Sequence, residues 1–197
     1  MSVAEDPSGK KRLILDVRFL NQYLWKEKIN FDDWKVLEDF IDSDSRAYLF
    51  KFDSKSGYHH IDIHRDHQKF LGFSWSFGNG PKRYFLYSVL PFGLSSGPLI
   101  FTKIVRVLIK YWRAHGIRIA CFLDDGLSVD YSEQKAKENS IFVARSLQKS
   151  GFIANEDKSQ WEPVTKIQWL GIALRISNVI IITFHLCTTL NPTTQFA

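Results

Sequence analysis

The stretch Ile117-Arg-Ile-Ala-Cys-Phe-Leu-Asp-Asp-Gly-Leu-Ser-Val129 places two adjacent carboxylates between two apolar runs. It predicts a strand over 117–123, a tight turn at Asp124-Asp125-Gly126 and a returning strand over 127–129, because Asp and Gly suit turn dihedrals. By itself, such a turn is more often structural than catalytic. Adjacent carboxylates at the tip of a hairpin nevertheless repel each other, and a cation relieves that repulsion.

A third carboxylate follows another predicted strand. The aromatic-rich segment 47–52 is strand-like and runs directly into Asp53. An aspartate at a strand end is often only a cap, but three carboxylates from two neighbouring strands can hold a pair of Mg²⁺ ions. Two such ions, about 3.5–4 Å apart, stabilise the attacking and leaving oxygens of a displacement at phosphorus. The combination therefore indicates phosphoryl transfer.

The rest of the chain predicts helices and hairpins around these strands. A helical spacing relates Trp34, Leu37, Phe40 and Ile41, with Asp32 or Asp33 as the cap. Further predicted elements are a strand over 12–18, a hairpin of 70–77 with 83–89, helices over 99–115 and 132–150, and a strand over 167–174. This order indicates an α+β fold, in which helices pack on one face of an antiparallel sheet.

The helix predicted over 99–115 carries a basic stripe. Its members, spaced three, four and three residues apart, are Lys103, Arg106, Lys110 and Arg113. We expect a solvated outer face here rather than contact with phosphate. The formal net charge of +5 permits a polyanionic partner without demonstrating one.

Composition excludes several classes of protein. The chain has 197 residues, 45% of them hydrophobic, which suits one globular domain. Its two cysteines, Cys121 and Cys187, are far apart and have no metal-ligand spacing, so neither a disulfide scaffold nor a zinc site is expected. No apolar run is long enough to cross a bilayer, and the polar N-terminal residues lack a signal-peptide core. We therefore expect an intracellular protein, in the cytoplasm or nucleus.

Four ordered blocks resemble the reverse transcriptases, particularly those of gypsy-like and DIRS-like retrotransposons. The blocks are Phe52-Asp-Ser-Lys-Ser-Gly-Tyr58, Leu90-Pro-Phe-Gly-Leu-Ser-Ser-Gly-Pro98, Phe122-Leu-Asp-Asp125 and Trp169-Leu-Gly171. The third block stands where the family usually has Tyr-x-Asp-Asp. The segment from Arg12 to Asn21 resembles the fingers strand that precedes the palm, and the match extends roughly from Gly9 to Leu174.

The resemblance implies an RNA-directed DNA polymerase with the palm fold of DNA and RNA polymerases. Residues 1–46 would be partial fingers. Residues 47–174 would be the palm, with a fingers insertion at about 59–90, and 175–197 a non-matching tail without a thumb. The implied partners are an RNA or DNA template with its primer and a dNTP, without a membrane.

The resemblance also implies the roles of individual residues. Asp53, Asp124 and Asp125 would be the catalytic metal ligands, with the Ser54 carbonyl completing one shell of two Mg²⁺ ions. Substrate contacts are implied for Arg12 at the triphosphate, Tyr58 as a steric gate against a 2′-hydroxyl, Phe92 and Gly93 in the nucleotide pocket, and Lys158 as the general acid for pyrophosphate. The hairpin of Trp169, Leu170 and Gly171 would grip the primer. Each assignment also has a structural alternative. Arg12 could be a surface arginine and Tyr58 a buried tyrosine, while Phe92 and Gly93 could form a turn packed in the core and Lys158 could be a solvated lysine.

The chain departs from the family pattern at two places, and two other functions are weighed beside reverse transcription. Phe122 replaces the usual tyrosine, and Asp6 and Pro7 occupy the region where a fingers lysine is expected. An inactive retroelement remnant that binds nucleic acid through its basic stripe and aromatic residues is one alternative. An RNA-dependent RNA polymerase is another, but the lack of a glycine before Asp124 and the ring of Tyr58 count against it.

Overall fold

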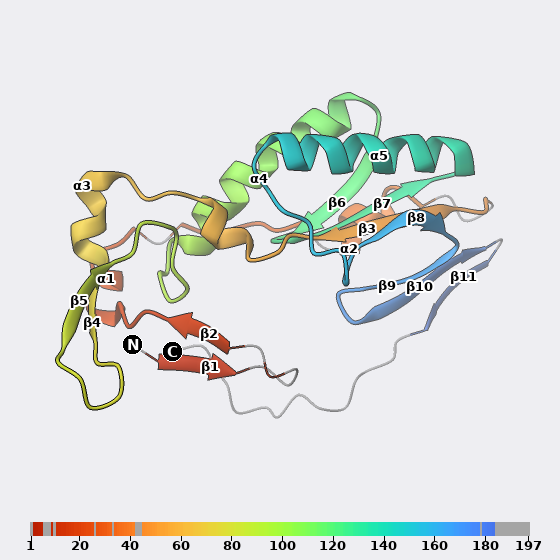
Figure 1. The fold of residues 1–197 in the computed structure, drawn as a ribbon. Coiled ribbons are helices and arrows are strands. Elements are labelled where there is room, and N and C mark those ends of the chain that lie inside the picture. Colours follow the sequence, from red (N-terminus) through yellow and green to blue (C-terminus); the bar gives the residue numbers. More distant parts are fainter. Residues whose placement is uncertain are drawn as a thin grey trace.

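A four-stranded antiparallel sheet forms the centre of the computed structural model, which describes residues 2–5, 9, 11–25, 27–32, 34–41, 45–177 and 179–183. The strand order is β6-β7-β3-β8, and the strands are β3 (Tyr48–Asp53), β6 (Arg118–Phe122), β7 (Asp125–Asp130) and β8 (Gln160–Val164). Two long helices, α4 (Gly97–Ala114) and α5 (Glu133–Lys149), cover one face (Figure 1). The predicted antiparallel sheet with helices on one face is confirmed.

The opposite face of this sheet packs against a smaller layer (Figure 1). That layer consists of helix α2 (Trp34–Glu38) and a three-stranded sheet of β9 (Lys166–Trp169), β10 (Ile172–Ser177) and β11 (Val179–Thr183). Leu37 of α2 and Trp169 of β9 are buried there against Leu49 and Val129. The central sheet therefore separates two hydrophobic cores.

Alternation along β3 decides which side chains reach which core. Phe50 and Phe52 are buried among the residues of α4 and α5, whereas Leu49 belongs to the core beside β9. Because successive side chains of a strand point to opposite faces, Asp53 lies on the same face as Leu49. The strand thus directs its terminal carboxylate away from the two helices and toward the β9–β10 layer.

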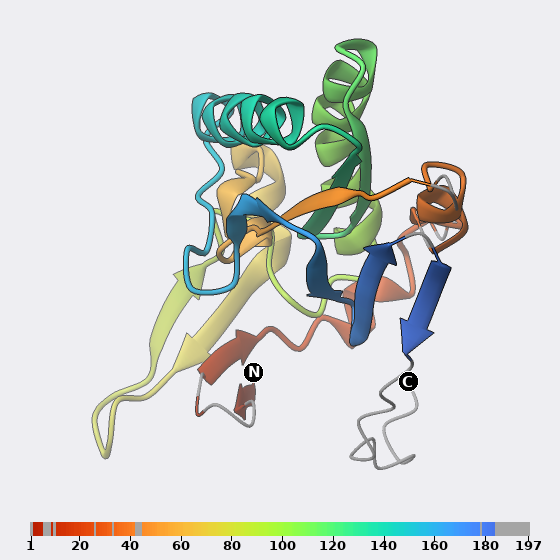
Figure 2. The same ribbon diagram turned by 90° about the vertical axis from the view of Figure 1, so that its right-hand side faces the viewer.

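The N-terminal elements and the 57–86 segment lie beside the central sheet (Figures 1 and 2). They are β1 (Ser2–Glu5), β2 (Lys11–Ile14), α1 (Arg18–Asn21), the 3₁₀ turns η1 (Gly57–His60) and η2 (Lys69–Leu71), α3 (Arg65–Gln68), β4 (Gly72–Trp75) and β5 (Arg83–Leu86). The predicted hairpin around 78–81 forms with shorter strands and projects from the body of the molecule in Figure 2. The strand predicted over 12–18 is wrong at its C-terminal end, because the chain enters α1 at Arg18.

The C-terminal part of the described chain also differs from expectation. The strand predicted over 167–174 is a hairpin, and β10 continues to Ser177, across the expected boundary at residue 175, where it pairs with β11. Residues 178 and 184–197 of the expected tail lie outside the described residues. No helix in the described part of the chain is long and apolar enough to cross a membrane.

Candidate functional site

The turn that carries the acidic pair is shifted from its predicted position. Strand β6 ends at Phe122 and β7 begins at Asp125, so the two turn residues are Leu123 and Asp124, with Leu123 in the left-handed region at φ 54°. Gly126 lies inside β7 instead. A Cβ atom added to Gly126 would lie 2.2 Å from a ring carbon of Phe52, its partner across the β3–β7 ladder. The glycine is needed for this close approach and not for the turn.

The three predicted carboxylates lie together at one end of the central sheet. The antiparallel register pairs Asp53 of β3 with Asp125 of β7, so both lie on the face turned from the helices. The amide of Ser54 donates a hydrogen bond of 2.9 Å to the carbonyl oxygen of Asp124. The end of β3 is therefore tied directly to the β6–β7 turn.

The loop after α5 holds Asp53 in place. Asn155 donates from its side chain to Asp53 Oδ1 at 3.1 Å and from its amide to the Asp53 carbonyl at 2.8 Å. Lys158 Nζ lies 3.9 Å from Asp53 Oδ2, and the Asp53 amide donates to Ser159 Oγ at 3.1 Å. Lys158 was predicted to be in the site, whereas Asn155 and Ser159 were not. Their hydrogen bonds span more than 100 positions, and no local spacing signals them.

Burial and neighbouring negative charge raise the pKa of one carboxyl group in the site. Burial, followed by the charges of Asp124 and Asp53, raises the pKa of Asp125 to about 6, while Lys51 and Lys158 oppose the shift. The side chains as they stand do not converge on one point, since no group of three acidic, histidine or cysteine residues in the described ranges is placed to share an ion. The donor set still suits Mg²⁺, because carboxylate oxygens are its preferred ligands and a cation would relieve the repulsion.

Two cavities meet at this cluster. A cavity of about 690 Å³ is lined by Asp124, Ser54, Tyr58 and Phe92, together with Lys11 from β2. A second cavity, of about 480 Å³, is lined by Asp125, Lys51, Asp157 and the turn of the β9–β10 hairpin. Asp53 and Lys158 line both cavities. The carboxylate cluster thus lies between two cavities that are lined by different residues.

The wall of the larger cavity is a fixed pair of rings. Tyr58 stacks on Phe92 with the ring centroids 5.1 Å apart and an angle of 15° between the planes, and it also contacts Phe101. A Cβ atom on Gly57 would lie 2.7 Å from the Phe101 ring, so this position requires a glycine. Burial and the charge of Asp124 raise the pKa of Tyr58 to about 12, so its hydroxyl stays protonated at neutral pH.

Two predicted substrate residues are placed differently from the others. Gly93, at φ 105°, does not line the cavities; a Cβ atom there would lie 2.3 Å from the Leu15 carbonyl oxygen. It lets the loop approach the chain after β2, where the Leu15 amide donates to the Phe92 carbonyl at 3.1 Å. Arg12 pairs with Ala4 in the β1–β2 ladder, and its side chain lies outside the described part of the structure.

The predicted primer-grip hairpin has its turn at Leu170 and Gly171, both with positive φ. Trp169 is 2% exposed and belongs to the core, whereas Leu170 is 40% exposed at the smaller cavity. Lys51 Nζ donates to the carbonyl oxygen of Gln168 at 2.8 Å, which joins β3 to this hairpin. The turn is thereby held beside Asp125.

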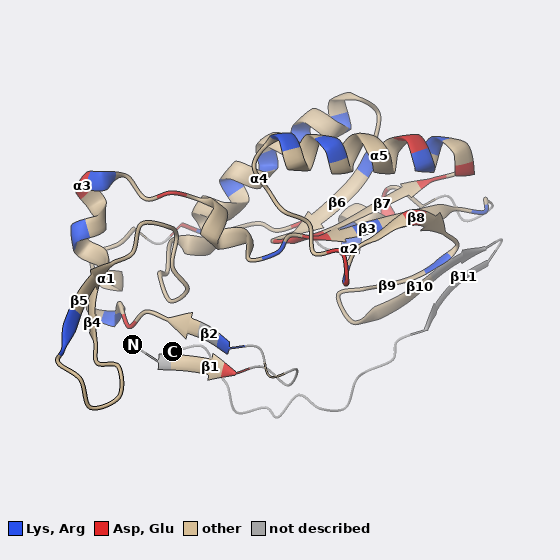
Figure 3. Ribbon diagram, viewed as in Figure 1, with Lys and Arg blue, Asp and Glu red and all other residues tan. Residues whose placement is uncertain are grey.

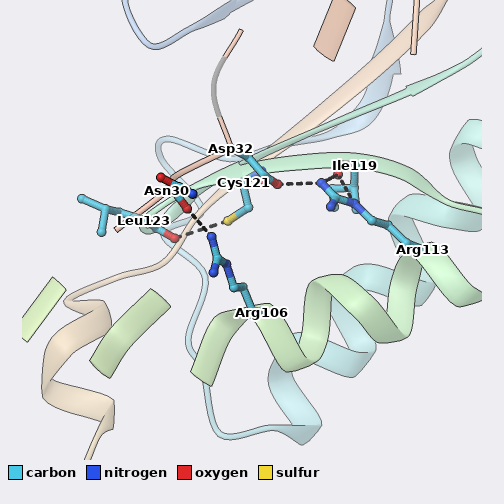
Figure 4. A network of polar contacts seen from close by, with 7 residues as sticks. All are labelled: Asn30, Asp32, Arg106, Arg113, Ile119, Cys121 and Leu123. Carbon is cyan, nitrogen blue, oxygen red and sulfur yellow. Dashed lines mark hydrogen bonds and ion pairs between the residues drawn. The ribbon is translucent and has the colours of Figure 1, made fainter. Parts of the chain in front are cut away.

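The basic stripe on α4 has a structural task (Figures 3 and 4). Three of its four members hold residues 27–32, here named the strap. Lys103 Nζ lies 2.9 Å from Glu27, Arg106 donates to the Asn30 carbonyl, and Arg113 lies 2.6 Å from Asp32. The stripe is exposed as predicted, and three of its members also pair with the strap, which the helical spacing did not predict. The prediction that Asp32 caps α2 is replaced by its pairing with Arg113, and Asp33 lies outside the described residues.

The strap covers the free edge of the central sheet just before the acidic turn. Strand β6 is an edge strand, and the Cys121 amide donates to Asp32 Oδ2 at 3.2 Å (Figure 4). Arg113 also donates to the Ile119 carbonyl of the same strand at 2.8 Å. Burial raises the pKa of the Cys121 thiol, which donates to the Leu123 carbonyl at 3.3 Å. The strap thus stabilises the strand that leads into Asp124.

Comparisons with known proteins identify relatives of this chain. The family model described as "Reverse transcriptase (RNA-dependent DNA polymerase)" matches residues 4–174. The genome polyprotein of Petunia vein clearing virus is 30% identical over 171 residues, which is 86% of this chain and 7% of that protein. The Tf2-3 transposon polyprotein of Schizosaccharomyces pombe is 25% identical over 164 residues, 83% of this chain and 12% of that protein.

Solved structures with a similar fold include foamy viral protease–reverse transcriptases. One, in complex with double-stranded DNA, has a TM-score of 0.73 at 22% identity and covers 88% of this chain and 28% of that chain. Another, in complex with an RNA/DNA hybrid, has a TM-score of 0.68 at 20% identity and covers 88% of this chain and 22% of that chain. This similarity confirms the polymerase-like fold.

Proposed function

The chain belongs to the reverse transcriptase (RNA-dependent DNA polymerase) family, and on this premise we propose that it is the nucleotidyl-transfer centre of a retroelement polymerase. The primer 3′-hydroxyl would attack the α-phosphate of a dNTP, so that a P–O bond to the primer forms and the bond to pyrophosphate breaks. The observation that carries the proposal is the register of Asp53 with Asp125, beside Asp124 and between two cavities.

The metal ligands of this reaction would be Asp53, Asp124, Asp125 and the carbonyl of Ser54. Two bound Mg²⁺ ions would neutralise charge on the phosphate and lower the pKa of the attacking hydroxyl. The raised pKa of Asp125 agrees with this assignment, since a bound cation would stabilise the ionised form that burial and the charges of Asp124 and Asp53 disfavour.

The two cavities suit the two substrates. The larger would take the dNTP, with the ring of Tyr58 under the sugar and Lys11 at the triphosphate. Arg12, the next residue of β2, is the predicted guanidinium contact to the triphosphate. The smaller would take the primer end against Leu170 and Gly171. Lys158, which lines both spaces, would give a proton to the departing pyrophosphate.

The nucleic-acid partner would be a template strand annealed to a primer. Solved structures with this fold were determined with double-stranded DNA and with an RNA/DNA hybrid, and we extend that class of partner to this chain. The Leu90–Gly93 block and the Phe122–Asp125 block favour a retroelement of the gypsy-like or DIRS-like kind.

Extension of a DNA primer on an RNA template tests the proposal. We expect Mg²⁺-dependent product from the parent chain and at least about 100-fold slower formation of product by Asp124→Asn. Salt-dependent binding of nucleic acid without product would favour the inactive remnant.

A further inference from the structure

The β4–β5 hairpin carries a continuous row of aromatic rings outside the carboxylate site. Tyr87 contacts Phe73 with ring centroids 5.5 Å apart, Phe73 stacks on Phe85 at 5.3 Å, and Phe85 contacts Phe77 at 6.3 Å. We name these four rings the aromatic ladder. Tyr87 also lines the larger cavity beside Asp124. The ladder therefore leads from the candidate catalytic cavity to the hairpin tip.

One face of the hairpin presents this ladder. The register pairs Phe73 with Phe85 and Trp75 with Arg83, and paired residues of an antiparallel ladder share a face. Burial falls along the face: Tyr87 and Phe73 pack against a small core, whereas Phe77 is 63% exposed and Trp75 37% exposed. Aromatic rings exposed at the tip add nothing to that core, so packing alone does not explain them.

The segment that contains the hairpin carries positive charges and no acidic residues. From His67 to Leu123 the sequence contains no aspartate or glutamate, while Lys69, Lys82 and Arg83 lie in or beside the hairpin. The Arg83 guanidinium lies 6.0 Å from the centroid of the Phe77 ring, and β5 is basic in Figure 3. Within the described ranges these three cations have no acidic partner, unlike Lys103 and Arg113, which are paired with the strap.

We propose that the aromatic ladder and the adjoining cations bind single-stranded nucleic acid. Unpaired bases would stack on Phe77 and Trp75, and Lys82 and Arg83 would contact the backbone phosphates. This combination suits a single strand, because an aromatic ring can stack with a splayed base of any identity. In a duplex the bases are stacked on one another, so no base face is free to stack on Phe77 or Trp75. These residues lie outside the carboxylate cluster, so strand binding by the hairpin would not depend on nucleotidyl transfer at that cluster.

Fluorescence anisotropy of the whole chain with a labelled oligouridylate tests this site. We expect Phe77→Ala to raise the dissociation constant by at least about fivefold, since stacking on one ring contributes on the order of 1 kcal/mol or more. Arg83→Ala should weaken binding and reduce the slope of log K against log salt by about 0.7, as expected for one lost phosphate contact. Phe77→Tyr and Arg83→Lys keep the ring and the charge, and should retain most of the affinity.

Matched controls separate this site from general effects. Trp25→Ala removes a ring that is 83% exposed outside the hairpin, and Lys110→Ala removes a cation of α4; neither should change the affinity. Primer extension is measured on the same variants, so failure of strand binding and failure of catalysis are separate results. No binding by the parent, a loss of duplex affinity in Phe77→Ala as large as the loss of single-strand affinity, or equal losses in Phe77→Ala and Trp25→Ala would overturn the proposal.

Discussion

Asp53 and Asp125 face each other across the β3–β7 ladder, one step beyond the pair formed by Phe52 and Gly126. Burial, followed by the charges of Asp124 and of the paired Asp53, raises the pKa of Asp125 to about 6. Gly126 allows the strands to approach by accepting the Phe52 ring against its backbone. The ionised Asp53–Asp125 pair that would bind Mg²⁺ therefore destabilises the fold, whereas Gly126 at the neighbouring position stabilises the pairing of the same strands.

Asp125→Asn should stabilise the protein at neutral pH in the presence of EDTA. The folded-state pKa of Asp125 lies above the ordinary value of 3.8, so the folded state binds the extra proton and ionisation costs stability. The advantage of the variant should be full above about pH 6 and disappear as the pH falls toward 3.8. Thermal unfolding of both proteins across this range checks it. An advantage that does not vary with pH would show that the charge is not its cause.

Gly126→Ala should destabilise the fold, because its Cβ atom would lie 2.2 Å from the Phe52 ring. Overpacking of this kind costs about 1–3 kcal/mol of unfolding free energy. Denaturant unfolding measures the loss. Gly72→Ala in β4 is the matched control, since its Cβ atom would meet Leu86 at 3.4 Å, an ordinary contact. Equal losses in the two variants would mean that the glycine is not required for the Phe52 contact.

Asp32→Ala should also destabilise the protein, because it leaves Arg113 and the Cys121 amide without their shared acceptor. Losing such a partner costs about 1–3 kcal/mol. A double-mutant cycle with Arg113→Ala should give a coupling energy clearly above zero. The control is Arg18→Ala, which breaks a pair with Asp16 whose arginine is 87% exposed, and stability should not change. Additive effects of Asp32→Ala and Arg113→Ala would show that the contact between the strap and Arg113 does not stabilise the protein.

Tyr58→Ala should relax discrimination between deoxyribonucleotides and ribonucleotides. The ring is held by its stack on Phe92 and lines the larger cavity, where we place the sugar. Incorporation of single nucleotides by the parent and the variant measures the ratio. Tyr58→Phe keeps the ring and should keep the discrimination. Loss of selectivity in Tyr58→Phe would point to the hydroxyl instead of to steric exclusion.

Local sequence predicts the carboxylate cluster well. The apolar runs before Asp53 and around Asp124 become adjacent strands, and the predicted residues Ser54, Tyr58, Phe92 and Lys158 line the same cavities. The position of the turn was wrong, because the contact of Gly126 with Phe52 depends on strand pairing that a local pattern does not contain.

Contacts between residues that are far apart in the sequence could not be predicted from local patterns. Arg113 and Asp32 are 81 positions apart, so the helical spacing of the stripe predicted a shared face but not what that face contacts. The hydrogen bond from Asn155 to Asp53 spans 102 positions and was missed for the same reason. Gly93 is near the predicted pocket in sequence, but the folded chain uses it to approach Leu15.

Extension of a labelled DNA primer by one nucleotide on an RNA template tests the central claim most directly. Asp124→Asn is compared with Asp66→Asn, an exposed carboxylate of α3 that lines neither cavity. We predict Mg²⁺-dependent extension by the parent and by Asp66→Asn, and a rate at least about 100-fold lower for Asp124→Asn. Extension that survives in Asp124→Asn, or no Mg²⁺-dependent extension by the parent, would contradict the assignment of this cluster as a polymerase centre.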